Sequence, residues 1–157
     1  AYSLVEYSGL TRKEFIQAMN DKAKAWDLGR TVFVEPSGLD EYNVSTAYDL
    51  GKMARKALKY DEILSATTTQ EYYFVTKNTA VPHTLRNSNR LLTKQSTFEV
   101  TGGKTGFIYE SYYNLITRVD ENGHRVIGVI LGNQSSEDRF WELYDAFEWT
   151  FLNWTWK

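Results

Sequence analysis

A glycine-rich run is the first place in this sequence where residue types and spacing could do chemistry. Residues 102–106 read Gly-Gly-Lys-Thr-Gly, which at first sight resembles a loop that holds a phosphate group. Such a loop needs a further glycine five positions before the glycine of the Gly-Lys-Thr triplet, and that position is occupied by Phe98. The flanking residues are also typical of a strand rather than of a loop that enters a helix. The sequence therefore argues against a phosphate-binding loop.

Lys104, Thr105 and Gly106 also suit an edge strand that faces a serine nucleophile. A lysine there places a cation beside the nucleophile and the substrate carboxylate, and a threonine hydroxyl can donate a hydrogen bond to that carboxylate. A glycine lets the substrate backbone approach the strand because it has no side chain. On the triplet alone, a glycine-bent strand with a surface lysine is an equally good interpretation.

Few other residues offer a competing site. The chain has no Cys, which excludes thiol nucleophiles and cysteine zinc sites. Its two histidines are interpreted as a loop residue (His83) and a hairpin residue (His124), so no metal site is expected. Ser45 stands at the start of a predicted helix, but Tyr48 occupies the position where the lysine partner of a serine nucleophile would be needed. We therefore expect Ser45 to act as an N-cap.

The elements that must position the glycine-rich run follow from periodicity and turn signals. A capping box of Thr11 and Glu14 opens a helix over residues 11–28, which Gly29 is expected to end. The further expected elements are a loop over 30–44, a helix over 45–59, a strand over 72–76, an irregular segment over 77–97, strands over 98–108, 112–119 and 125–131, an Asn-Gly hairpin turn within 120–123 and a helix from about 136. This order predicts an α+β fold, with helices followed by an antiparallel sheet and a C-terminal packing helix.

Length and composition limit the class of protein. The 157 residues fit one domain, with a helical part over 1–70 and the sheet plus C-terminal helix over 71–157. The net charge of −2 argues against a nucleic-acid partner, and no run of 18 apolar residues could span a membrane. Residues 1–7 read like the tail of an earlier helix, so we expect the chain to have been cut from something longer.

Ordered blocks along nearly the whole chain resemble the serine D-alanyl-D-alanine carboxypeptidases, which are the low-molecular-weight penicillin-binding proteins of peptidase family S11. The blocks are Pro36-Ser37-Gly38-Leu39-Asp40, Asn87-Ser88-Asn89-Arg90-Leu91-Leu92, Gly103-Lys104-Thr105-Gly106-Phe107, Tyr113-Asn114-Leu115, and Val129-Ile130-Leu131-Gly132 followed by Arg139-Phe140. The resemblance implies a partial β-lactamase/DD-peptidase-like fold. It also implies an enzyme that binds peptidoglycan stem peptides and β-lactam inhibitors, needs no cofactor, and works in the bacterial cell envelope outside the cytoplasm.

The same resemblance implies the roles of individual residues. Lys104 would be catalytic, and so would the backbone N–H of Phe107 as half of an oxyanion hole. Thr105, Gly106 and Arg139 would bind substrate. For Arg139 the alternative is a first-turn arginine paired with a neighbouring carboxylate of the last helix. Asn89 is interpreted as an amide that orders its loop.

The family's nucleophile motifs are missing from this sequence. No serine is followed three residues later by lysine, and no Ser-x-Asn motif is present. The chain therefore resembles the C-terminal part of the catalytic domain, and we expect it to be inactive alone. Ile108 and Ser111-Tyr112 also differ from the threonine and Ala-Gly that are usual there. A serine β-lactamase of the same fold, or a non-catalytic binding module that kept the fold, remain the alternatives.

Two surface segments carry further expectations. The strand over 125–131 is apolar and β-branched between Val126 and Leu131, and in the related fold N-terminal strands pair beside it. We expect its open edge to pair with the missing N-terminal segment, another copy or a partner protein. Trp149, Trp154 and Trp156 could mark a membrane-surface helix, but Asp145 and Glu148 favour packing of that helix onto the sheet instead.

Overall fold

The computed structural model describes residues 1–93 and 96–156. Its helices are α1 (Tyr2–Tyr7), α2 (Arg12–Ala25), α3 (Ala47–Ala57), α4 (Asp61–Thr68), α5 (Arg90–Thr93) and α6 (Asp138–Asn153). Its strands are β1 (Glu71–Val75), β2 (Pro82–Arg86), β3 (Glu99–Ile108), β4 (Tyr112–Glu121) and β5 (His124–Asn133). Residues 94–95, which belong to the expected irregular segment, and residue 157, which ends the expected domain, lie outside the described residues. The predicted α+β class is confirmed.

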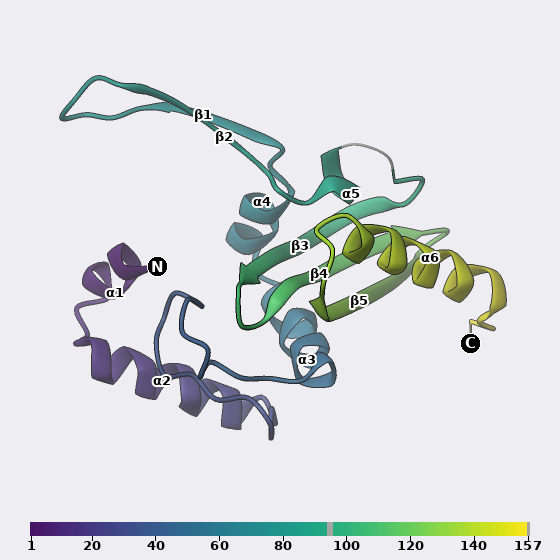
Figure 1. Ribbon diagram of the computed structural model, residues 1–157, viewed down its shortest axis with the longest axis horizontal. Coiled ribbons are helices and arrows are strands. Elements are labelled where there is room, and N and C mark those ends of the chain that lie inside the picture. The colour runs from purple at the N-terminus through teal and green to yellow at the C-terminus, as the bar shows by residue number, and fades with distance from the viewer. Residues whose placement is uncertain (94–95, 157) are drawn as a thin grey trace.

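The central sheet is antiparallel, with the strand order β3-β4-β5, and it lies between helices (Figure 1). A Cβ added to Gly128 of β5 would lie 2.4 Å from Leu143 and 2.9 Å from Phe147, both of α6. The next residue, Val129, instead approaches Gly51 of α3. Because neighbouring residues of a strand point to opposite faces, α6 and α3 cover opposite sides of the sheet.

The main core lies between α6 and the sheet. Phe140, Leu143 and Phe147 of α6 are buried against Leu115 and Val119 of β4. These three residues recur at spacings of three and four, which places them on one face of the helix, and the expected packing of the last helix onto the sheet is confirmed. Burial of side chains of this size contributes about 1.5–3 kcal/mol each.

Turn and cap chemistry explains where several elements begin and end. Asn122 and Gly123 have positive φ angles of 50° and 79°, which confirms the predicted Asn-Gly turn between β4 and β5. The capping box of Thr11 and Glu14 is also present. The expected C-terminal role of Gly29 is wrong, because Asp27 already takes the left-handed conformation after α2, with φ 58°.

The N-cap of α3 differs from the prediction by one residue. Thr46, not Ser45, caps this helix, since its hydroxyl accepts a hydrogen bond from the backbone N–H of Asp49 at 3.2 Å. Ser45 instead shares a hydrogen bond with the hydroxyl of Thr31, at 2.8 Å between the two oxygens. Both residues are good N-caps in sequence, and the contact to the preceding loop decides between them.

The loop before α3 closes around a carboxylate. Val32 and Val44 pair at its base, and between them the side chain of Glu35 is buried, with only 3% of the residue exposed. Glu35 accepts hydrogen bonds from the backbone and side chain of Ser37 and from the backbone of Leu39. The Pro36–Asp40 block therefore owes its shape to one acceptor group.

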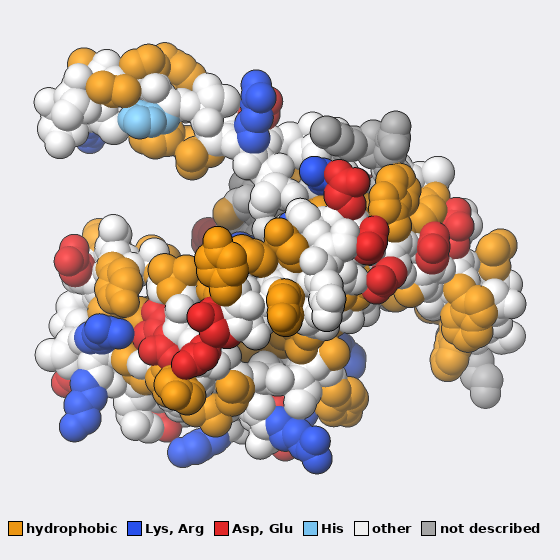
Figure 2. All heavy atoms as spheres, viewed as in Figure 1, with side chains coloured by type: hydrophobic (Ala, Val, Ile, Leu, Met, Phe, Trp, Pro, Cys, Tyr) orange, Lys and Arg blue, Asp and Glu red, His pale blue; other side chains and the backbone are white. Residues whose placement is uncertain are grey.

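Strands β1 and β2 form a hairpin that projects from the body of the molecule (Figure 1). The expectation of an irregular segment over 77–97 was wrong at residues 82–86, which form β2, and at residues 90–93, which form α5. His83, expected in a loop, is a strand residue whose ring stacks on that of Phe74, with ring centroids 5.1 Å apart. The strand signal is weak there because β2 begins with Pro82 and contains no β-branched run. Figure 2 shows apolar side chains gathered on this hairpin.

The C-terminal tryptophans do not share one environment. Trp156 stacks on His124 at the start of β5, with ring centroids 4.3 Å apart, so His124 is a hairpin residue as predicted. Trp149 and Trp154 are mostly exposed and lie outside the core. Within residues 1–93 and 96–156, no helix has both the length and the apolar character that a membrane span requires.

Candidate functional site

The glycine-rich run lies on β3, at an edge of the sheet. Within the described part of the chain β3 pairs only with β4, so the backbone groups on its other side face away from the sheet. Alternation along the strand places Lys104, Gly106 and Ile108 on one face, and Thr105 and Phe107 on the other. The interpretation as a strand is confirmed, and the run presents an edge along which an extended peptide could lie.

Packing explains two of the three glycines in the run and leaves the third free. A Cβ at Gly102 would lie 2.8 Å from Leu58, and one at Gly103 would lie 2.7 Å from the backbone oxygen of Ile116. Gly103 therefore needs glycine for the fold, whereas a Cβ at 102 would require the Leu58 side chain to shift. A Cβ at Gly106 would meet Asn114 at 3.5 Å, which is an ordinary contact. Nothing inside the described structure requires the absence of a side chain at 106.

Lys104 carries a cation at this edge. Its side chain keeps exposed surface, and its ammonium group donates a hydrogen bond to the backbone oxygen of Thr105. Burial among the surrounding protein atoms lowers the pKa of Lys104, and the positive charge of Arg139 lowers it further. The lysine therefore releases its proton more readily than a free lysine does, and the two cations together favour an anion in this region.

Thr105 lies beside a hydroxyl that the sequence analysis did not select. Its Oγ1 is 2.6 Å from the Oγ of Ser88, which precedes α5. Seventeen residues separate the two, so only the fold brings them together. The available sequence signal was the Asn-Ser-Asn segment at 87–89, whose amides are typical loop anchors.

Arg139 is almost buried in the first turn of α6 and is committed to backbone oxygens. Its Nη1 donates to the carbonyls of Gly106 and Asn114, at 3.1 and 3.2 Å, and its Nε donates to the carbonyl of Ser136 at 3.2 Å. Its guanidinium also lies 5.0 Å from the ring centre of Tyr113. The arginine therefore fastens the first turn of α6 to the strand pair at Gly106, immediately next to Lys104 and Thr105.

The side chain of Phe107 takes part in an aromatic stack rather than in the core. Its ring lies 4.3 Å from that of Tyr113, its partner on β4, and 43% of the residue is exposed. Asn89, in contrast, is buried and accepts a hydrogen bond from the backbone N–H of Leu91 at 3.1 Å. That contact confirms its interpretation as an amide that orders its loop.

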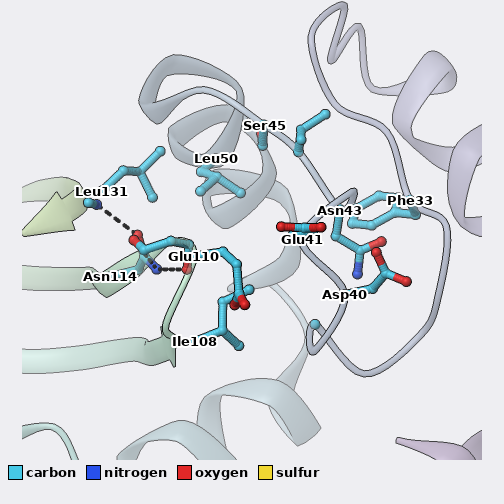
Figure 3. Close-up of a pocket in the computed structure, with 14 residues that line it drawn as sticks. Phe33, Asp40, Glu41, Asn43, Ser45, Leu50, Ile108, Glu110, Asn114 and Leu131 are labelled. Atoms are coloured by element: carbon cyan, nitrogen blue, oxygen red, sulfur yellow. Dashed lines mark hydrogen bonds between the residues drawn. The ribbon is translucent and has the colours of Figure 1, made fainter.

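A pocket of about 430 Å³ opens where β3 ends. It lies between the loop before α3, the start of α3, the end of β3, the start of β4 and the end of β5 (Figure 3). Asp40, Glu41 and Glu110 line it, and Asn114 bridges its sheet side by accepting from the backbone N–H of Gly132 at 2.9 Å. Ile108 also lines it, so the pocket lies at the end of the face of β3 on which alternation places Lys104.

Comparison with known proteins identifies the class to which this fold and this strand belong. The sequence profile of the D-alanyl-D-alanine carboxypeptidases, peptidase family S11, matches residues 1–135. D-alanyl-D-alanine carboxypeptidase DacF of Bacillus subtilis is 33% identical over 150 residues, which cover 95% of this chain and 38% of that protein. D-alanyl-D-alanine endopeptidase of Haemophilus influenzae is 35% identical over 144 residues, which cover 88% of this chain and 47% of that protein.

Solved structures agree with the sequence comparison. The crystal structure of the Streptomyces K15 DD-transpeptidase superimposes with a TM-score of 0.80 at 31% identity, and covers 89% of this chain and 55% of that one. The chain thus spans about half or less of the proteins that it matches. It belongs to the S11 family of D-alanyl-D-alanine carboxypeptidases, as the resemblance of its motifs indicates.

Proposed function

We propose that this chain supplies the substrate-binding strand of a penicillin-binding, serine-type D-alanyl-D-alanine carboxypeptidase. Its substrates would be the stem peptides of peptidoglycan, and β-lactams would inhibit it. In the reaction, a serine hydroxyl attacks the carbonyl of the D-Ala-D-Ala bond, the terminal D-alanine leaves, and water then hydrolyses the acyl-enzyme. The serine and its lysine would come from a further segment of the same protein, because this sequence contains no Ser-x-x-Lys.

We assign the proposed roles to residues of β3 and of the first turn of α6. Lys104 would stabilise negative charge beside the nucleophile, and Thr105 would donate to the terminal carboxylate of the substrate. The backbone N–H of Phe107 would provide half of the oxyanion hole, whose loss typically costs about 10²–10³ in rate. Arg139 would add positive charge and hold the strand end, as its bonds to the carbonyls of Gly106 and Asn114 support.

The single observation that carries this proposal is Gly106. A Cβ at this position would make only an ordinary contact with Asn114, whereas a Cβ at Gly103 on the same strand would lie 2.7 Å from a backbone oxygen. Glycine at 106 is therefore explained by a ligand backbone that lies against the strand edge, as a peptide substrate would.

Alanine substitutions at the two glycines test the proposal with a built-in control. In the full-length protein, Gly106→Ala should change the free energy of unfolding by no more than about 1 kcal/mol relative to the wild type. It should nevertheless lower kcat/KM for an N-acyl-D-Ala-D-Ala peptide. Gly103→Ala should instead destabilise the fold by about 1–3 kcal/mol, because its Cβ meets a backbone oxygen. Full activity in Gly106→Ala would contradict the proposal, as would a wild-type protein that neither cleaves the peptide nor reacts with penicillin. The latter result would favour a non-catalytic module.

We infer that the partner of the open sheet edge is the serine-bearing segment of the same protein. Within the described residues β5 pairs on one side only, with β4, and its half-buried apolar residues would template a further strand. The isolated chain should self-associate at micromolar concentration, whereas the full-length protein should not. Light scattering that shows a stable 18.2 kDa monomer of the isolated chain would contradict this inference.

The location that goes with this function is the extracytoplasmic side of the cell envelope. Peptidoglycan stem peptides are present there, and an enzyme that trims them has to meet them at the cell wall. The net charge of −2 and the absence of cysteine are compatible with that location.

A further inference from the structure

The Asn-Ser-Asn segment at 87–89 is fastened at both ends. On one side, the amide of Asn87 donates to the backbone oxygens of Thr67 and Thr69, at 3.0 and 3.1 Å, and its backbone N–H donates to the oxygen of Gln70 at 2.8 Å. These acceptors lie at the C-terminal end of α4 and just beyond it. The segment is thus tied to a helix that itself contacts β3.

On the other side, Asn89 reaches into the sheet. Its Nδ2 donates to the hydroxyl of Thr117 on β4 at 3.3 Å, and only 2% of the residue is exposed. The amide fits there because Gly103 has no side chain, since a Cβ at 103 would lie 2.9 Å from that same Nδ2. The glycine next to Lys104 therefore makes room for the anchor of the segment.

Between the two anchors, one exposed hydroxyl is held against the candidate site. The Oγ of Ser88 lies 2.6 Å from the Oγ1 of Thr105, at hydrogen-bond distance. We propose that Ser88 is a positioning residue, whose hydroxyl donates a hydrogen bond to the Oγ1 of Thr105 and thereby directs the O–H of Thr105 toward the terminal carboxylate of a D-alanine-terminated ligand. This inference rests on the proposed function, because it takes the carboxylate as the group that Thr105 binds.

The number of protons and lone pairs on each hydroxyl decides which of the two donates the hydrogen bond. A hydroxyl has one proton and two acceptor lone pairs. If Thr105 donated to Ser88, it would present only lone pairs to the ligand, and a carboxylate would be repelled. If Ser88 donates, the proton of Thr105 is free for the carboxylate, and the accepted bond polarises Thr105 into a stronger donor. Lys104, whose cation lies on the same strand, favours the anion that stabilises this direction.

Binding of a carboxylate ligand and its matched amide tests the proposal in the full-length protein. The ligand is an N-acyl-D-Ala-D-Ala peptide whose scissile bond is reduced to a methylene-amine, with either a free carboxylate or a primary amide at its end. Isothermal titration calorimetry gives the dissociation constants for the wild type, Ser88→Ala, Thr105→Val and the double variant. Ser88→Thr tests rescue, and Ser3→Ala, which removes an exposed hydroxyl on α1, is the control.

Ser88→Ala should weaken binding of the carboxylate ligand by about three- to tenfold and change binding of the amide by less than about twofold. In the Thr105→Val background the same substitution should have no further effect, because there is no threonine proton left to direct. Ser88→Thr should restore binding. Equal losses on both ligands, an additive double variant, or no loss at all would each overturn the proposal.

The outcome for Ser88 can be separated from the outcome for the enzyme. Hydrolysis of the unmodified peptide is measured on the same preparations. If the wild type binds the analogue but does not cleave the peptide, the proposed function fails, and Ser88 is still judged by the dissociation constants. If the wild type binds neither the carboxylate ligand nor the amide, both proposals are overturned.

Discussion

Replacing Glu35 with glutamine tests whether one buried carboxylate holds the loop before α3 in shape. Its Oε2 accepts from the backbone N–H and the hydroxyl of Ser37, at 2.7 and 2.5 Å. Its Oε1 accepts from the backbone of Leu39 at 2.9 Å, from the side chain of Asn43 at 2.8 Å, and from the backbone N–H of Gly38. An amide replaces one of these oxygens with an NH₂ group, so at least two donors lose their acceptor whichever way it rotates.

The pKa of Glu35 gives the size of the effect. Burial alone would raise this pKa, but the donors of Ser37, Leu39 and Gly38 outweigh it and lower the value from 4.5 to about 2. That difference corresponds to about 3 kcal/mol at most, and because the glutamine keeps one oxygen that still accepts from some of these donors, we expect a loss of about 2 kcal/mol. Since the folded pKa is lowered, this stabilisation is complete above pH 4.5 and is lost as the pH falls from there toward 2.

Urea unfolding of the wild type and the variant across this pH range measures both effects. Near neutral pH, the free energy of unfolding of Glu35→Gln should be about 2 kcal/mol lower than that of the wild type. In acid the difference should shrink, because protonation removes the wild-type advantage. Glu41→Gln makes the same chemical change at an exposed position of the same loop and should be nearly neutral. Equal stability of Glu35→Gln and wild type at neutral pH, or a difference that persists unchanged in acid, would show that the Glu35 carboxylate does not hold the loop in shape.

Three further predictions concern Lys104 and the missing serine nucleophile. Lys104→Ala in the full-length protein should slow acylation by penicillin by about 10²-fold or more, since it removes a cation where negative charge develops; stopped-flow rates within about twofold of wild type would contradict this. Because the pKa of Lys104 is lowered from 10.5, its ammonium group should lose its charge at a pH below 10.5, and the KM for a carboxylate-terminated peptide should rise with pH in that range. This rise in KM should be absent from Lys104→Ala. The isolated chain should show no penicilloyl mass by intact-mass spectrometry, whereas a stoichiometric adduct would reveal an overlooked nucleophile.

Local signals were sufficient for the elements whose pattern is complete within a short window. The Asn122-Gly123 turn defines its hairpin by itself, because both residues tolerate a positive φ. The stripe of Phe140, Leu143 and Phe147 likewise indicates which face of α6 is buried. On the same basis the Lys-Thr-Gly triplet could be placed on a strand, and the S11 resemblance could be recognised from ordered motifs.

Other features depend on contacts that no short window contains. Ser45 and Thr46 are equivalent caps until the loop brings Thr31 to Ser45. The contact between Ser88 and Thr105 arises only after α4 and β4 have anchored the two flanking asparagines. Whether packing requires a glycine can also be judged only when the partner strand β4 is in place: it requires glycine at 103 but not at 106.

A crystal structure of the penicillin-acylated full-length protein is the most direct test of the role of β3. The penicilloyl group should lie along the outer edge of β3, with its carboxylate within hydrogen-bond distance of Thr105 Oγ1 and its ester carbonyl oxygen directed at the backbone N–H of Phe107. A penicilloyl group bound away from β3, or one whose carboxylate does not meet Thr105, would contradict the proposed role of this strand.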